Sequence, residues 1–136
     1  MAKRKENSTN SINRDFITTN CDAIYTICKI EGRWKMMILF NLAEYEVLRF
    51  NELKEKVYGI TDRMLSLQLK ELEADQLIQR QVFAEVPPRV EYALTSIAQD
   101  LLPIWPALEA WGAKHRALQD DTDKLKGDSS ISNKTT

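Results

Sequence analysis

The sequence predicts a mainly α-helical fold with one small β-hairpin, an α+β arrangement. Apolar residues recur at helical spacing in several segments. Two short alternating runs follow, separated by a pair of prolines. The chain has 136 residues, of which 43% are hydrophobic and 29% are charged, as in an ordinary globular protein. We therefore expect one domain built mostly from helices.

The two ends of the chain have the composition of tails. Residues 1–15 are rich in Asn, Ser and Lys, and residues 119–136 are similarly polar. Such segments bury too little apolar surface to offset the entropy that is lost when a chain becomes ordered. We expect disordered tails over 1–15 and 119–136, and a folded domain over 16–118.

Two helices are predicted at the start of this domain. Apolar residues three or four positions apart indicate helices over 21–30 and 33–45. Asn20 or Asp22 is expected to cap the first helix. The second has the broader apolar face and is expected to be central in the core.

Two further helices are predicted on either side of a tight corner. A short helix over 51–57 begins at Asn51, which is expected to cap it. Gly59 can take the positive φ of the corner, and Thr61 suits the N-cap of a longer helix over 62–75. The arrangement is that of a helix-turn-helix. The expected buried stripe of the longer helix is Leu65, Leu69 and Leu72.

A β-hairpin is predicted directly after these helices. Residues 77–84 and 90–94 alternate between apolar and polar, and Pro87 and Pro88 lie between them. Prolines lack an N–H and cannot continue a strand ladder, so they mark a stiff tip that is expected to hold Arg89 outward. A helix-turn-helix followed by a hairpin is a winged helix, and this tip would be the wing tip.

A last helix is predicted from Thr95 or Ser96 to about Leu118, and Pro103 and Pro106 make it start irregularly or kink. Together with the helix over 21–30, it carries more apolar side chains than one small domain needs. These side chains either form a dimer interface or line a small-molecule pocket, and we favour the interface. The expected interface residues are Ile24, Ile27, Leu101, Trp105, Leu108 and Trp111.

The composition also bears on compartment and chemistry. No apolar run is long enough to span a bilayer and the basic N-terminus has no apolar core, so we expect a cytoplasmic protein. Cys21 and Cys28 form no disulfide framework and, with one distant His115, have no zinc-site spacing. Cys28 lies among isoleucines and is expected in the core. The sequence indicates no enzyme motif, metal site or cofactor.

The helix over 62–75 is the candidate for reading DNA. The net charge is −1, so positive charge for DNA must be local. The outward side chains of this helix suit base reading in a major groove, although they also suit a solvated helix face. Arg89 either enters a minor groove or pairs with Glu85 or Glu91, and we favour the contact with DNA. The expected base-reading residues are Thr61, Arg63, Ser66, Leu67 and Lys70, with phosphate contacts from Arg49, Asn51, Lys54 and Arg80.

Four stretches of the sequence together resemble the HxlR-type family of bacterial transcriptional regulators, relatives of the MarR-type winged helices. They are GRWKMMILFNL (32–42), RFNELKEKVYGITDRMLSLQLKELEADQLIQR (49–80), VPPRVEYALT (86–95) and LPIWPALEAWG (102–112). The resemblance covers about residues 21–112. It implies a homodimer that binds double-stranded operator DNA and represses or activates nearby genes.

The resemblance also implies a role for Cys21. Many members carry an N-terminal cysteine at this position that senses oxidants or electrophiles. Asp22 replaces the usual proline here, and a neighbouring carboxylate disfavours the reactive thiolate. Three readings stay open: a regulator switched by thiol modification, a ligand-gated regulator without a thiol role, and a winged helix that binds another protein.

Overall fold

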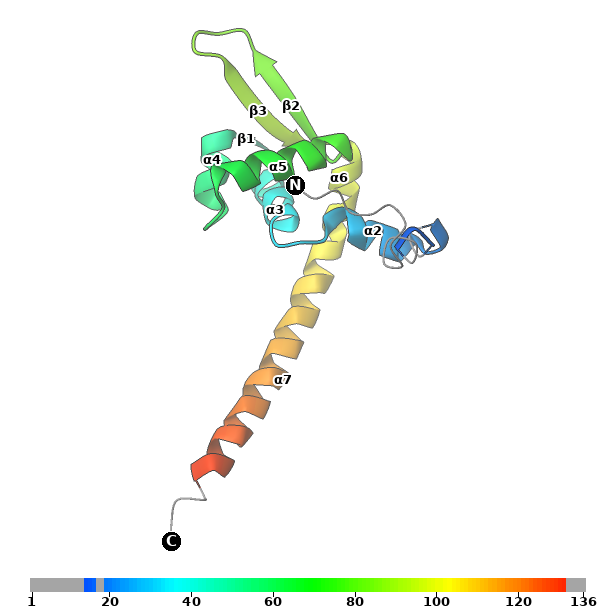
Figure 1. Ribbon diagram of the computed structural model, residues 1–136, viewed down its shortest axis with the longest axis vertical. Coiled ribbons are helices and arrows are strands. Elements are labelled where there is room, and N and C mark those ends of the chain that lie inside the picture. The colour runs from blue at the N-terminus through cyan, green and yellow to red at the C-terminus, as the bar shows by residue number, and fades with distance from the viewer. Residues whose placement is uncertain (1–13, 17–18, 132–136) are drawn as a thin grey trace, which may run out of the picture. The chain divides into compact units, whose positions relative to one another are not determined.

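The computed structural model describes residues 14–16 and 19–131, and the chain divides into one unit that ends at Gln99 and another that begins at Asp100. Predictions for residues 1–13, 17–18 and 132–136 lie outside the described residues. Figure 1 shows the helices and strands in chain order. The elements are α2 (Asp22–Ile30), α3 (Lys35–Tyr45), β1 (Val47–Arg49), α4 (Phe50–Lys56), α5 (Asp62–Ala74), β2 (Ile78–Phe83), β3 (Arg89–Leu94), α6 (Ser96–Leu101), a short 3-10 helix η1 (Leu102–Ile104) and α7 (Trp105–Ile131).

The core of the first unit lies between α3, α4, α5 and the sheet. Apolar positions at i, i+3 and i+4 place one side of each helix inward, and the predicted stripe of α5 is buried. Burying an aliphatic side chain of this size contributes about 1.5–3 kcal/mol. The largest fully buried side chains are Ile38, Leu42, Leu53, Val57, Leu65 and Leu72.

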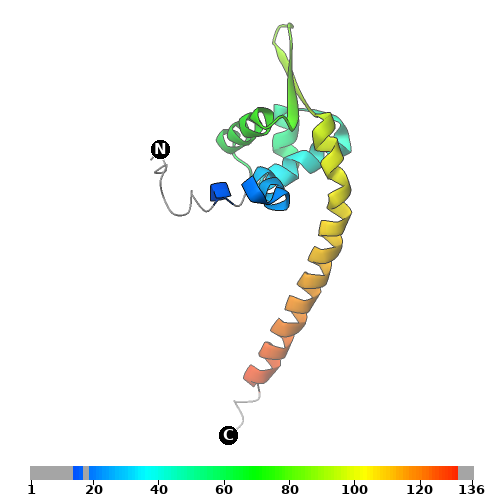
Figure 2. The ribbon, with the colours of Figure 1, turned by 90° about the vertical axis from the view of Figure 1, so that its right-hand side faces the viewer.

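A three-stranded antiparallel sheet completes this unit, with the strand order β1-β3-β2. The predicted hairpin is confirmed as β2 and β3, and Figure 2 shows it projecting from the helices of the first unit. The sequence did not predict β1, in which Leu48 pairs with Tyr92 of β3. A strand of three residues is too short to show a period of two, so its only signal is the distant partner strand.

The corner between α4 and α5 matches its prediction. Gly59 takes φ of 84°, which L side chains rarely adopt. The Met64 backbone N–H donates to Thr61 Oγ1 at 3.2 Å, so Thr61 caps α5. The cap of α4 differs from the prediction. Arg49 is the N-cap residue, and its backbone N–H donates to Glu52 Oε1 at 2.9 Å, which places Asn51 inside the helix.

The start of α2 also differs from the prediction. Cys21, in an extended conformation, is the N-cap residue, rather than Asn20 or Asp22. At the other end of the first unit Thr95 caps α6, as one of the two predicted alternatives. The Ala98 backbone N–H donates to Thr95 Oγ1 at 3.3 Å, and this hydroxyl donates to Gln76 O at 2.7 Å.

The second unit consists mainly of α7, which continues beyond the predicted end at Leu118. Pro103 lies in η1 and Pro106 in the first turn of α7, where a missing N–H is tolerated, so the prolines define the entry to the helix. Residues 119–131 are helical, contrary to the expected disordered tail. Opposite charges four positions apart, such as Asp120 and Lys124, favour helix in this exposed segment.

We predict that Gly59→Ala lowers the free energy of unfolding by about 1 kcal/mol, because alanine is strained at positive φ. An added Cβ would meet no atom within 4 Å, so the loss comes from the backbone conformation and not from a clash. Urea unfolding followed by circular dichroism measures it. Gly127→Ala in α7 is the control and should be neutral or stabilising. An unchanged midpoint for Gly59→Ala would contradict the assignment.

We predict that Thr61→Ala destabilises the protein by about 1 kcal/mol, because the Met64 N–H loses its acceptor. Thr61→Ser keeps a hydroxyl at the same place and should recover most of the loss. Thermal or urea unfolding of the three proteins compares them directly. The capping role is wrong if serine and alanine destabilise equally.

Candidate nucleic-acid interface

The two faces of α5 have opposite characters. Leu65, Leu69 and Leu72 are buried against the core. The side chains predicted to read bases all lie exposed on the other side of the helix. They come from the first three turns of a helix of 13 residues, which is about 20 Å long. The predicted base readers on α5 are Arg63, Ser66, Leu67 and Lys70, and the acidic side chains Asp62, Glu71 and Glu73 of this helix are also exposed.

An ion pair links α4 to the first turn of α5, beside this exposed face. Lys54 Nζ of α4 is 2.7 Å from Asp62 Oδ1 in the first turn of α5. Both side chains are well exposed, so the pair contributes at most about 1 kcal/mol to stability. The carboxylate suits the helix N-terminus. It also neutralises part of the charge that Lys54 was expected to offer to a phosphate.

Arg89 is not held outward, contrary to the prediction. Its guanidinium lies 4.1 Å from the ring centroid of Phe83, its cross-strand partner. It also lies 3.4 Å from both Glu85 Oε1 and Glu91 Oε1. The two carboxylates flank the arginine because Glu91 follows it on the same face of β3 and Glu85 precedes the tip. In the free chain, Arg89 therefore adopts the paired alternative.

The sheet separates two of the expected phosphate contacts. Arg80 pairs in register with Tyr92 and shares a face with Ile78, and both of these neighbours are buried. Arg49 pairs in register with Glu91, which points to the opposite face because side chains alternate along a strand. Arg49 and Arg80 are both exposed, but they do not lie on one common sheet face.

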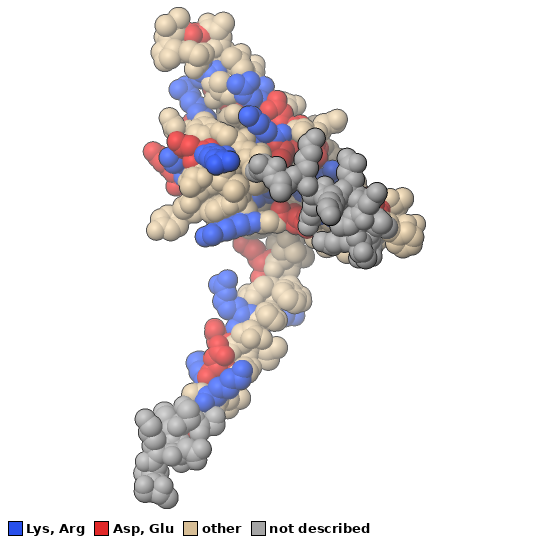
Figure 3. All heavy atoms as spheres, viewed as in Figure 1, with Lys and Arg blue, Asp and Glu red and all other residues tan. Residues whose placement is uncertain are grey.

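The surface charge over this region is mixed. In Figure 3 blue Lys and Arg side chains lie over the helices and the base of the hairpin, with red acidic side chains among them. Asn51 is exposed in the first turn of α4 and adds a neutral donor. Positive and negative side chains are thus interspersed over this region, and the net charge of the whole chain is −1.

Two ion pairs tie the far half of α5 to the preceding helices. Lys35 Nζ of α3 lies 2.8 Å from Glu71 Oε2, and Lys29 Nζ of α2 lies 3.2 Å from Asp75 Oδ1 at the end of α5. The hydrogen bond to Asp75, with its negative charge, raises the pKa of Lys29 above its ordinary value. These pairs could not be predicted from the sequence, because such charges are common on any helix surface.

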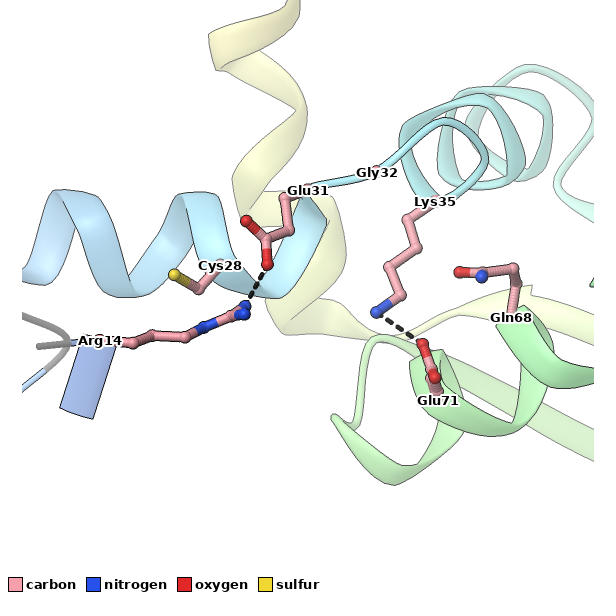
Figure 4. A pocket seen from close by; sticks show the side chains of 7 residues that line it. All are labelled: Arg14, Cys28, Glu31, Gly32, Lys35, Gln68 and Glu71. Carbon is pink, nitrogen blue, oxygen red and sulfur yellow. Dashed lines mark hydrogen bonds and ion pairs between the residues drawn. The ribbon is translucent and has the colours of Figure 1, made fainter. Parts of the chain in front are cut away.

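A cavity of about 540 Å³ lies next to these ion pairs. Figure 4 shows Arg14 meeting Glu31 on one side and Lys35 meeting Glu71 on the other. Cys28 lines the cavity and is half-buried, so its prediction as a core residue is wrong. No residue of α2 is buried, and the thiol faces polar side chains. The other lining residues are Gly32 and Gln68.

Cys21 and the expected interface residues are accessible to different degrees. Cys21 is half-buried, and both cysteines are free thiols. Ile24 and Ile27 of α2 are exposed. In the second unit Trp111 is 66% exposed and stacks on His115 with ring centroids 5.0 Å apart. The rest of the set comprises Leu108, which is exposed, and Leu101 and Trp105, which are half-buried.

Two other kinds of site are absent from the part of the chain that the structure describes. Within residues 14–16 and 19–131, no helix has the length and apolar character needed to cross a bilayer. In the same ranges, His, Cys, Asp and Glu side chains do not gather in a group of three that could hold a metal ion.

Comparisons with known proteins agree with this geometry. The family model described as "HxlR-like helix-turn-helix" matches residues 29–120. The chain is 51% identical over 92 residues to an uncharacterised HTH-type transcriptional regulator of Halalkalibacterium halodurans, covering 68% of this chain and 81% of that protein.

Two solved structures of redox-related regulators are also similar. The redox regulator HypR in its reduced form has a TM-score of 0.68 and 38% identity, covering 74% of this chain and 98% of the other. The reduced form of the transcriptional regulator YodB from Bacillus subtilis has a TM-score of 0.60 and 32% identity, covering 67% of this chain and 89% of that one. The fold is therefore the winged helix of MarR-like regulators, as predicted. The chain belongs to the HxlR-like helix-turn-helix family, whose members are DNA-binding transcriptional regulators and not enzymes.

Proposed function

We propose that the protein is a sequence-specific regulator that acts in the cytoplasm as a homodimer on a pseudo-palindromic operator, and that it represses transcription by occupying this site. The observation that carries the proposal is the exposed face of α5. A helix whose opposite side is completely buried presents Arg63, Ser66, Leu67 and Lys70 to the solvent. A helix of this diameter fits a major groove about 12 Å wide.

Each side chain on this face suits a distinct contact. Arg63 can make two hydrogen bonds to the O6 and N7 atoms of guanine, and Ser66 can donate to or accept from either base. Lys70 lies further along the helix and suits a base edge or a phosphate. Thr61 and the start of α5 suit a phosphate, because Thr61 Oγ1 accepts one hydrogen bond and keeps its own proton to donate.

The hairpin and α4 would secure the flanks. In the proposed complex, phosphate groups compete with Glu85 and Glu91 for the guanidinium of Arg89, which then reaches the minor groove. Asn51, Lys54 and Arg80 add phosphate contacts. Arg49, on the sheet face that also carries Arg89, adds a further phosphate contact.

The exposed apolar residues support a dimer. Ile24 and Ile27 leave α2 with an unburied apolar side, and Leu108 and Trp111 do the same for α7. A homodimer carries two copies of α5, the proposed recognition helix, and half-sites one helical turn of DNA apart, about 34–36 Å, would accept both. This spacing is what gives a pseudo-palindromic operator.

We further propose that modification of Cys21 changes DNA binding. Two similar structures are of HypR, described as a redox regulator, and of YodB, which has been solved in reduced and diamide-treated forms. Cys21 begins α2, and α2 is joined to the end of α5 through Lys29 and Asp75. A shift of α2 would therefore also move α5, the proposed recognition helix. The ligand-gated alternative would instead use the polar cavity beside Cys28.

We predict that Arg63→Ala relaxes base preference, whereas Arg89→Ala weakens binding more evenly across sequences. Arg63 reads a base edge in this proposal, and Arg89 reads shape and charge. Selection from a randomised duplex pool, followed by gel shifts, measures both effects. Arg63→Lys is the matched control, since it keeps the positive charge and loses the bidentate hydrogen bonding to guanine. Unchanged base preference in Arg63→Ala would refute the assignment.

We predict that diamide or a quinone releases the wild-type protein from its operator and leaves Cys21→Ser bound. Cys28→Ser is the matched control and should respond as the wild type does, since it keeps the thiol at the start of α2. Gel shifts with and without the oxidant compare the three proteins. The thiol switch is wrong if Cys21→Ser responds like the wild type, and the ligand-gated alternative then gains support.

A further inference from the structure

One large apolar side chain, Leu67, lies on the exposed face of α5. It is two residues from both Leu65 and Leu69, so at about 100° per residue it points about 160° away from each of these buried leucines. Leu67 is therefore not an edge of the core stripe. Arg63 and Lys70 lie four residues before it and three after it, on the same face of the helix.

Helix stability does not explain a leucine at this position. Lys, Gln and Glu have nearly the same helix propensity as Leu, and they would keep the face hydrated. The neighbouring amide of Gln68 donates from its Nε2 to Met64 Sδ at 3.4 Å and lines the cavity beside α3, away from this face. The side chain between Arg63 and Lys70 on this face of α5 is consequently apolar.

We propose that Leu67 reads the C5-methyl group of a thymine in each operator half-site, an inference that rests on the proposed function. The methyl of thymine is the apolar group that base edges present in the major groove, and apolar side chains recognise it by contact. Burial of this methyl against Leu67 favours thymine over cytosine or uracil at that position. The contact is non-covalent and involves no hydrogen bond.

The position of Leu67 also relates this thymine to a second base. The rise along α5 from Arg63 to Leu67 is about 6 Å, close to two base-pair steps of about 3.4 Å each. If Arg63 binds a guanine, the thymine read by Leu67 lies about two base pairs from it. Ser66, between them, tolerates either base. The inferred half-site therefore combines one fixed guanine with one fixed thymine.

Replacing thymine by deoxyuridine tests the contact, because only the methyl group is lost and the hydrogen-bonding edges stay the same. The probe is the tightest duplex selected from a randomised pool, synthesised with deoxyuridine at every thymine position and then with single symmetric thymine pairs restored. We expect the wild type to bind the deoxyuridine duplex about fourfold more weakly per half-site, and one restored pair to recover the loss.

Variants at Leu67 separate the contact from general effects of deoxyuridine on the duplex. Leu67→Ala should bind the thymine duplex more weakly and discriminate little between the two duplexes, since its side chain is too short to reach. Leu67→Met, of similar volume, should keep the discrimination. Helical circular dichroism of each variant verifies folding, which an exposed position should not disturb.

The outcomes distinguish this inference from the function on which it rests. If wild type and Leu67→Ala lose the same factor on deoxyuridine, or if no single thymine pair restores binding, the methyl contact is wrong while the regulator stands. If the wild type shows no salt-sensitive binding to any selected duplex, the proposed function itself fails, and the inference fails with it.

Discussion

The burial of one leucine stripe on α5 determines which side chains of this helix face outward. Leu65 and Leu72 are completely buried and Leu69 is 2% exposed, and each contributes about 1.5–3 kcal/mol to folding. A helix that is packed against the core in this way cannot rotate about its own axis. The outward direction of Arg63 and its neighbours is thus a consequence of core packing. Gly59 and Thr61 add the second constraint, because they fix where the helix begins.

This dependence explains which features could be predicted from the sequence. The helix α5, its cap, its corner and its two faces follow from local signals, namely a period of 3.6, a glycine and a threonine. Strand β1 could not be predicted because its pairing with β3 is remote in the chain. The environment of Arg89 depends on hairpin register, which places Phe83 and Glu91 beside it. The helical continuation to Ile131 is mostly polar, so few apolar residues reveal it.

Two ion pairs connect the C-terminal half of α5 to the rest of the first unit. Lys35 and Lys29 reach Glu71 and Asp75 from two different helices, and Lys35 is mostly buried at 13% exposure of its side chain. They partly neutralise Glu71 of α5 and Asp75, the residue that follows this helix. The two pairs therefore link α2 and α3 to the helix that carries the proposed base-reading side chains.

The central claim, that this surface binds operator DNA, is tested most directly by one titration. The protein is titrated against the DNA upstream of its own gene and against a random-sequence duplex, each at two salt concentrations. We predict tighter binding to the upstream DNA. The affinity for both duplexes should fall steeply at the higher salt concentration, because the release of counterions from DNA then gains less free energy. A well-folded protein that binds neither duplex at low salt, with its thiols reduced, would contradict the account and favour a protein-binding winged helix.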